Sequence, residues 1–231
     1  MKESYFDYYY GMDGSVSHRK NAKKIFVKIF AGFKFLFDRL VAIFGLIIAS
    51  PIMLVIAILI KIDSKGPVLF KQVRTGKNGV NFNVYKFRTM VAHNDVHDFS
   101  KADQHTKIGK LLRKTSLDEL PQLFSICSGK MSFIGPRPWI TDYYENMNEV
   151  QRHRCDVRPG LTGLAQVMGR NNITIFDKIN YDLEYIKNYS FKQDIKIIIL
   201  TIKAVISGSG ADAGKSTIEN ELNDLKRSNN K

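Results

Sequence analysis

The chain has 231 residues, and 35 Lys and Arg against 22 Asp and Glu give it a formal net charge of +13. This length allows one well-buried core and excludes a second large domain. The basic balance favours a polyanionic partner, whether nucleic acid, an anionic membrane surface or a phosphorylated substrate. The two cysteines, Cys127 and Cys155, are too few for a disulfide framework and lack metal-ligand spacing, which indicates a reducing, cytosol-facing location.

The N-terminal region is polar and aromatic, without an apolar stretch or a cleavage site, so we expect no signal peptide. Residues 1–19 are expected to form a mobile tail. A helix is predicted from residue 20 onward, because lysines recur every fourth residue and phenylalanines mark a second stripe: Lys20, Lys24, Lys28, Phe26, Phe30, Phe33 and Phe37. This basic amphipathic helix could pack on its own domain or lie on a membrane surface.

An uncharged apolar run covers residues 41–60. A straight helix of this length would extend about 30 Å, enough to cross a bilayer. Ser50 and Pro51 stand at its midpoint, however, and proline removes a helical hydrogen bond and kinks the chain, which leaves two arms of about 15 Å each. Basic residues flank both ends, so a single crossing cannot keep both flanks in the cytoplasm. The pattern favours a re-entrant helix over a kinked span or a soluble core helix, with Ser50 available to bond a carbonyl freed at the break.

Two β-like runs between residues 67 and 90 flank a turn rich in Gly and Asn, which predicts a β-hairpin. By the period-two rule, one face of the second run carries an apolar series that ends in two cations: Val80, Phe82, Val84, Lys86 and Arg88. Such a face suits either the edge of a phosphate-binding site or an ordinary exposed strand end.

The remaining elements are expected from polarity and periodicity: a polar loop at 91–105, a helical segment at 108–114 leading into a second helix start at 115–116, a surface helix at 139–155, a helix at 176–190 and an apolar helix at 195–206. In the last of these, Lys196 and Lys203 lie seven residues apart on one face, which suits either a core helix or one in the membrane interface. The polar tail from Ser207 onward is expected to be mobile.

Adjacent carboxylates, Asp118 and Glu119, are the first candidates for chemistry. Ser116 and Glu119 have the spacing of a capping box, in which the Glu side chain reaches back to the backbone at the helix start. A helix start also favours ionised carboxylates and attracts phosphate. At such a place one carboxylate can act as a nucleophile while the other holds a divalent metal. Capping and catalysis are compatible, and the spacing alone leaves both open.

Arginines beside proline or glycine recur in the second half of the chain. Arg137 stands between Pro136 and Pro138, which gives a rigid presentation of a bidentate phosphate binder. Arg158 and Arg170 likewise adjoin proline or glycine. A segment at 210–216 resembles a phosphate-binding loop, but Ser209 stands where that loop requires glycine, so an ATPase is not expected.

Several motifs together resemble the bacterial sugar transferase family of monotopic phosphoglycosyl transferases over about residues 35–206. They are the Ser-Pro break, Lys-Phe-Arg-Thr-Met at 86–90, Arg-Lys-Thr-Ser-Leu-Asp-Glu-Leu-Pro-Gln at 113–122, Gly-Pro-Arg-Pro at 135–138 and Arg-Pro-Gly-Leu-Thr-Gly at 158–163. The resemblance implies a two-step reaction in which Asp118 attacks the sugar-bearing phosphorus of a UDP-sugar and releases UMP. Undecaprenyl phosphate then takes the phosphosugar from Asp118.

The same resemblance assigns roles to other residues. Glu119 would help to bind Mg²⁺, which offsets the crowding of negative charge. The implied phosphate or nucleotide contacts are Lys86, Arg113, Arg137 and Arg170, with Asp182 as an accessory polar residue and Arg88 and Arg158 as further candidates. Met168 and Leu164 stand where the family often has Asn and Trp, so the donor sugar stays open.

The expected fold is α+β, mostly helical and membrane-associated, with a re-entrant helix–break–helix, interfacial amphipathic helices and a small β-hairpin. The chain would divide into a mobile tail (1–19), an amphipathic and re-entrant helix (20–65), a cytosol-facing catalytic domain with interfacial helices (66–206) and a polar C-terminal tail (207–231).

The implied partners are a UDP-sugar, undecaprenyl phosphate and the cytoplasmic leaflet of the bacterial inner membrane, with a homodimer as the expected oligomer and no nucleic acid. Two other classes remain as alternatives. The charge would suit a membrane-tethered nucleic-acid-binding protein, although no recognisable binding module is present. A non-enzymatic membrane scaffold would tolerate the exchange of Asp118 and Glu119 for amides.

Overall fold

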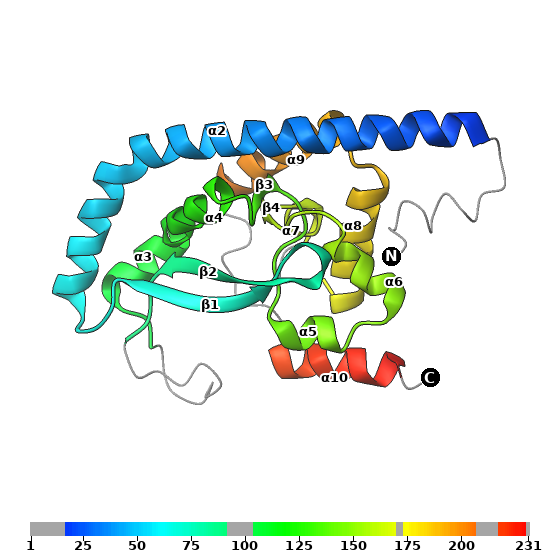
Figure 1. The fold of residues 1–231 in the computed structure, drawn as a ribbon. Helices are drawn as coiled ribbons and strands as arrows, with labels where there is room; N and C mark the ends of the chain where they lie inside the picture. The colour runs from blue at the N-terminus through cyan, green and yellow to red at the C-terminus, as the bar shows by residue number, and fades with distance from the viewer. Residues whose placement is uncertain (1–16, 92–103, 170–172, 207–216, 230–231) are drawn as a thin grey trace.

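The computed structural model describes residues 17–91, 104–169, 173–206 and 217–229. Within them the chain is mostly helical, with two small two-stranded sheets, which confirms the α+β class. Figure 1 shows the body of the protein packed beneath one long helix, α2. The elements are α2 (Ser17–Asp63), β1 (Leu69–Thr75), η1 (Lys77–Gly79), β2 (Asn81–Phe87), α3 (Lys107–Thr115), η2 (Leu117–Gln122), α4 (Leu123–Cys127), β3 (Ser132–Ile134), α5 (Thr141–Glu145), α6 (Glu149–Arg152), η3 (His153–Cys155), β4 (Gly160–Thr162), α7 (Leu164–Met168), α8 (Ile175–Lys187), α9 (Phe191–Ile206) and α10 (Ile218–Asn229).

Helix α2 runs through the Ser-Pro break as one bent helix of 47 residues. Figure 1 shows it running straight over the body and then turning sharply down in its light-blue part. Pro51 cannot donate to the carbonyl of Ile47, and this lost bond is the usual cause of such a kink. Ser50 Oγ donates to that same carbonyl at 2.8 Å. The prediction that Ser50 provides the local partner at the break is therefore confirmed.

The start and the exposure of α2 refine the sequence prediction. The helix begins at Ser17, so residues 17–19 belong to it and not to a tail, while residues 1–16 lie outside the described part of the chain. Residues 25–63 are long and apolar enough to cross a membrane, and most of them are exposed; Ile48, for example, is 75% exposed. This exposure argues against a helix buried in the core of a soluble protein.

The predicted hairpin is confirmed. Strands β1 and β2 pair antiparallel in a register that sets Phe70 opposite Lys86 and Arg74 opposite Phe82. Phe82 and Val84 are buried in a cluster with α2 and α4 residues, which fixes the apolar face of β2 inward. Because side chains alternate along a strand, Lys86 continues on that inner face at the end of β2.

The glycine-rich motif at 158–163 is explained by backbone packing. Strand β4 pairs in parallel with β3, and the amide of Gly160 donates to the carbonyl of Pro136 at 2.9 Å. A Cβ at Gly160 or Gly163 would overlap the backbone of Gly135. These glycines are therefore needed for the close approach of two chain segments, one of which leads directly to Arg137.

Two helix predictions need correction. The segment 139–155 is broken into α5, α6 and η3, because Asn148 forms a capping box with Gln151 and starts a new helix. The polar C-terminal tail contains α10, which packs on α5 and α8 with Leu225 fully buried. Residues Ile218, Leu222 and Leu225 have helical spacing, and this short apolar stripe explains why the segment folds.

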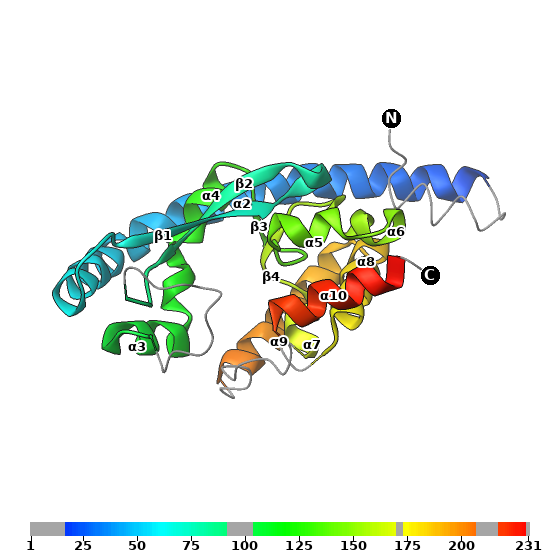
Figure 2. The same ribbon diagram turned by 90° about the horizontal axis from the view of Figure 1, so that it is seen from below.

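Helix α9 has a buried and an exposed face. Asp194 and Ile197 are buried, whereas the apolar side chains toward the end of the helix are exposed, up to 82% for Ile206. The start of α9 contacts α2 through the ion pair of Asp194 with Lys34, and Figure 2 shows the rest of α9 running away from α2. Of the two positions left open by the sequence, the interfacial one agrees better with this exposed apolar face.

Candidate active site

The end of α3 places Asp118 and Glu119 in the first turn of η2. Ser116 adopts a left-handed conformation, with φ 57°, and its amide donates to the carbonyls of Arg113 and Leu112, which ends α3. The Ser116 side chain makes no cap bond to η2, and the Glu119 side chain binds cations instead of the backbone. The capping-box interpretation is therefore wrong, and both carboxylates are free of that role.

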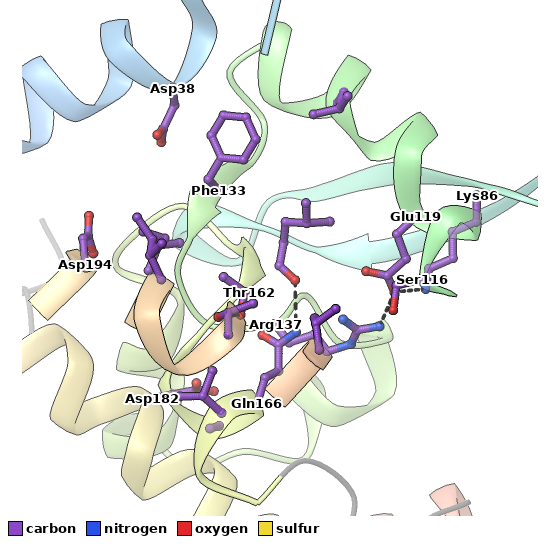
Figure 3. A pocket seen from close by; sticks show the side chains of 18 of the residues that line it. Asp38, Lys86, Ser116, Glu119, Phe133, Arg137, Thr162, Gln166, Asp182 and Asp194 are labelled. Atoms are coloured by element: carbon purple, nitrogen blue, oxygen red, sulfur yellow. Dashed lines mark hydrogen bonds and ion pairs between the residues drawn. The ribbon is translucent and has the colours of Figure 1, made fainter. Parts of the chain in front are cut away.

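Glu119 lies between two cations from different parts of the fold, as Figure 3 shows. Its Oε1 accepts from Lys86 Nζ on β2 and from Arg137 Nη2, the latter at 2.8 Å. Burial by itself would raise the pKa of Glu119, but Arg137 and Lys86 outweigh that effect and lower it to about 2. Glu119 is thus a fixed anion at neutral pH.

Asp118 has the opposite electrostatic environment. It is 8% exposed, and its Oδ2 lies 3.9 Å from Lys86 Nζ, a longer ion pair than those of Glu119. Burial raises the pKa of Asp118 above its ordinary value, and Lys86 opposes the shift. Two neighbouring carboxylates with pKa values displaced in opposite directions are typical of sites in which the two groups have different tasks.

Arg74 is a cation of the site that the sequence prediction missed. It lies on β1, on the same face of the hairpin as Lys86, and lines the same cavity. Burial and the nearby Arg137 lower the pKa of Arg74 to about 10. Its Nη1 reaches the carbonyl of Pro138 at 3.5 Å. The hairpin pattern carried a signal for Arg74. Residues that pair across two strands share a face, so Arg74, which pairs with Phe82, lies on the face that also carries Lys86.

Helix α3 contributes a basic wall. Arg113, Lys110 and Lys114 all line the cavity. Arg113 Nη1 lies 2.8 Å from His105 Nε2, while His105 Nδ1 lies 3.3 Å from the carbonyl of Thr89. A neutral His105 with its proton on Nδ1 satisfies both contacts. The structure therefore brings Arg113 to the cavity, as predicted, and places His105 in contact with its guanidinium group.

Arg137 is held from behind by a buried ion pair. Arg154 Nη2 donates to the carbonyl of Arg137 at 2.8 Å and to Asp182 Oδ2 at 2.7 Å. Asp182 is 1% exposed and receives two hydrogen bonds from Arg154. Asp182 thus supports the Arg137 segment through Arg154, a residue that sequence reasoning missed because no spacing links it to the motifs.

Two further predicted residues, Arg88 and Arg158, do not line this cavity. Arg88 points to the end of α2, where it donates to the carbonyls of Lys65 and Ser64. Arg158 donates to the carbonyl of Gly129 and stacks on Phe35. In this structure each of the two guanidinium groups binds backbone carbonyls outside the cavity that contains Asp118 and Glu119. Arg170 lies outside the described residues.

A cavity of about 1470 Å³ connects the charged residues to an apolar arm. Its polar end is lined by Arg74, Lys86, Lys110, Arg113, Lys114, Asp118, Glu119 and Arg137. Its mainly apolar arm lies between α2 and α9, whose charged residues Lys34, Asp38 and Asp194 also reach the wall. The apolar lining consists of Phe30, Phe33, Phe37, Val41, Ile195, Ile198, Ile202 and Val205. One continuous space thus joins an anion-binding region to a surface suited to a hydrocarbon chain.

The carboxylate pair fits a magnesium ion that substrate phosphates help to hold. Within the described residues no cluster of three or more His, Cys, Asp or Glu side chains forms a complete metal site. Mg²⁺, however, is commonly bound by one or two carboxylates, substrate phosphates and water. Lys86 and Arg137 both contact Oε1 of Glu119, so among the described residues neither cation occupies the second oxygen, which could face a metal.

Comparison with known proteins gives a consistent assignment. A family model described as bacterial sugar transferase matches residues 29–208. The UDP-glucose:undecaprenyl-phosphate glucose-1-phosphate transferase of Klebsiella pneumoniae is 47% identical over 182 residues, which are 74% of this chain and 39% of that protein. The UDP-N-acetylgalactosamine-undecaprenyl-phosphate N-acetylgalactosaminephosphotransferase of Aeromonas hydrophila is 39% identical over 193 residues, 79% of this chain and 46% of that protein.

A relative of similar size is the sugar transferase EpsL of Bacillus subtilis, which is 43% identical over 179 residues, 77% of this chain and 89% of that protein. The chain therefore spans less than half the length of the Klebsiella and Aeromonas relatives and most of the length of EpsL.

Proposed function

Because the chain belongs to the bacterial sugar transferase family, we propose that it transfers a sugar 1-phosphate from a UDP-sugar to undecaprenyl phosphate. The products would be a polyprenyl-diphosphate sugar and UMP, in the first membrane step of surface glycan assembly. The observation that carries the proposal is the pair formed by Asp118 and Glu119, whose pKa values shift in opposite directions at the polar end of a cavity with an apolar arm. The two functionally named relatives use different sugars, so the donor sugar stays open.

In the first step, an Asp118 oxygen attacks the sugar-bearing phosphorus, the phosphorus–oxygen bond to UMP breaks, and UMP leaves with that electron pair. In the second step, an oxygen of undecaprenyl phosphate attacks the same phosphorus and Asp118 leaves as a carboxylate. Asp118 is better suited than Glu119 to form and break a bond to phosphorus. The carboxylate of Glu119 is occupied by hydrogen bonds from Arg137 and Lys86, whereas Asp118 has a raised pKa.

The surrounding cations have a binding and stabilising task. Arg113 and Arg137 line the cavity and would bind phosphate oxygens, while Lys86 lies against both carboxylates. When bound at Glu119, Mg²⁺ would neutralise charge on the diphosphate and so reduce its repulsion of an anionic nucleophile. We place the polyprenyl chain in the apolar arm between α2 and α9.

We further propose that α2 enters and leaves the membrane on the cytoplasmic side. Both flanks of its apolar stretch contact the same body: before the stretch Lys34 pairs with Asp194 at 2.7 Å, and after it Asp63 Oδ2 accepts from the amide of Ile108 at 2.9 Å. A straight crossing would put these flanks on opposite sides of a bilayer core about 30 Å thick. The arm after Pro51 extends only about 20 Å, which suits a re-entrant path.

The test is UMP release by the full chain in detergent or nanodiscs, with a panel of UDP-sugars, polyprenyl phosphate and Mg²⁺. Asp118→Asn should abolish release with every sugar. The matched control is Asp224→Asn, which makes the same change on the exposed face of α10 and should leave the rate unchanged. Undiminished release by Asp118→Asn would exclude the nucleophile. Retained function in the cell with both carboxylates exchanged for amides would favour a scaffold.

A further inference from the structure

Helix α10 lies beyond the residues that the family model matches, which end at 208, and yet it contributes to the cavity wall through Ile218 and Glu221. Figure 2 shows α10 lying across the underside of the body, next to α5. Leu225 is fully buried and fixes the helix in the core. A segment outside the matched family region is therefore built into the site.

Glu221 forms two polar contacts between α10 and the body. Its Oε2 accepts from the Tyr143 hydroxyl on α5, and its Oε1 accepts from Lys178 Nζ on α8, each at 2.6 Å. Burial and the neighbouring Glu221 raise the pKa of Tyr143, so its hydroxyl keeps the proton that it donates. Hydrogen bonds to a charged acceptor are stronger than neutral ones, which makes this contact a firm one.

A continuous series of contacts leads from Tyr143 to Arg137. The Tyr143 ring packs on Trp139 with centroids 5.1 Å apart, and the Arg154 guanidinium lies over the Trp139 ring at 3.7 Å from its centroid. Arg154 in turn donates to the carbonyl of Arg137 at 2.8 Å. Each member of the series touches the next, from α10 to the arginine that binds Glu119.

We propose that Glu221 is a positioning residue, which holds Tyr143 and Trp139 so that Arg154 keeps Arg137 at the substrate phosphates. Arg137 stands between two prolines and has little freedom of its own, so its position depends on where its segment is held. A displacement of this arginine would weaken its hydrogen bonds to the substrate phosphates, because such bonds depend steeply on distance and angle. The expected effect on UDP-sugar binding rests on the proposed function, whereas the contact between Glu221 and Tyr143 does not.

Trp139 is the chain's single tryptophan, so its fluorescence reports on the middle of this series without any substrate. In the full chain in nanodiscs, Glu221→Ala and Tyr143→Phe should both increase acrylamide quenching of Trp139, by about half or more. Tyr143→Phe keeps the ring and removes only the hydroxyl, so it preserves the test if Glu221→Ala folds poorly. The matched control, Glu219→Ala, changes an exposed carboxylate on the same helix and should leave the quenching unchanged.

The second readout separates positioning from general destabilisation. Glu221→Ala should raise the KM for UDP-sugar by about five- to tenfold, with a much smaller change in the rate at saturation. In an Arg137→Ala background the same change should add nothing, because Glu221 acts through Arg137. The double variant Tyr143→Phe with Glu221→Ala should equal the stronger single variant.

Three results would overturn the inference: unchanged quenching of Trp139, altered quenching with an unchanged KM, or a KM effect of equal size in the Arg137→Ala background. If the wild-type chain releases no UMP from any UDP-sugar, the proposed function fails, while the Trp139 measurement still decides whether α10 holds this segment.

Discussion

Arg137 Nη2 lies 2.8 Å from Glu119 Oε1, so the arginine between the two prolines already binds the carboxylate next to the proposed nucleophile. This contact fixes Glu119 as an anion, whereas Asp118 has only a longer ion pair with Lys86, at 3.9 Å, among the described residues. The motifs at 113–122 and 135–138 are distant in the sequence, and the fold joins them through this ion pair. The division of tasks between two adjacent carboxylates follows from it.

The pH dependence of UMP release should reveal Asp118. Its pKa is raised by burial, so the carboxylate becomes protonated, and activity falls, at a higher pH than for an ordinary Asp. Lys86 lowers this pKa and Glu119 raises it. Lys86→Met should therefore move the acid limb of single-turnover UMP release to higher pH, and Glu119→Gln should move it to lower pH.

Lys86→Met should also reduce the rate by about 100-fold, as expected for the loss of a cation at developing charge. Shifts of the same sign in both variants would contradict the assignment of the limb to Asp118.

Stability in acid should depend on Glu119. Its pKa is about 2 in the folded protein, against an ordinary value of 4.5. A lowered pKa contributes stability that is fully present above the unfolded value and is lost as the pH falls from about 4.5 toward 2. Thermal midpoints of the wild type should therefore fall more steeply over this window than those of Glu119→Gln. Glu184→Gln, on the exposed face of α8, serves as the control and should follow the wild type.

The buried ion pair of Arg154 and Asp182 should affect substrate binding only indirectly, by holding the backbone of Arg137. Asp182→Asn leaves a buried arginine without its counter-ion, which typically costs about 3–5 kcal/mol in the free energy of unfolding. The combined change Arg154→Met with Asp182→Leu should recover most of that stability. It should nevertheless raise the KM for UDP-sugar above that of the wild type, because Arg154→Met removes the donor to the carbonyl of Arg137. Recovery of both properties would show that the pair serves stability alone.

The path of α2 can be tested by cysteine labelling in intact spheroplasts and in inverted vesicles, with Cys127 and Cys155 replaced. Single cysteines at Lys28 and Lys61, near the two ends of the helix, should both react only from the cytoplasmic side. Pro51→Ala restores an amide donor to the carbonyl of Ile47 and should straighten the helix, so one site should change sides. Labelling of the two sites from opposite sides in the wild type would contradict the re-entrant path.

The sequence predicted what depends on local periodicity and motif composition. The hairpin, the helix predicted at 176–190 and the Ser50 contact at the break follow from alternation, spacing and the chemistry of proline. The structure confirms the hairpin and the contact, and it places the helix at Ile175–Lys187. The grouping of Lys86, Arg113 and Arg137 with the carboxylates was expected from the motifs, and the fold brings them to one cavity.

What failed depended on tertiary contacts. Arg88 and Arg158 belong to motifs, but each binds carbonyls that only the folded chain brings near. Helix α10 is too short and polar to be stable alone, and its burial of Leu225 against distant elements is what stabilises it. Arg154 has no motif around it, and its role became visible only with Trp139 and Asp182 beside it.

The central claim, a covalent bond between Asp118 and the phosphosugar, is tested most directly by intact-protein mass spectrometry after brief mixing with each UDP-sugar in Mg²⁺ and without polyprenyl phosphate. The account predicts a mass increase equal to one phosphosugar, located on the peptide that contains Asp118 and lost when polyprenyl phosphate is added. Asp118→Asn should show no increase. An adduct that persists in Asp118→Asn, or UMP release in the wild type without any adduct, would contradict it.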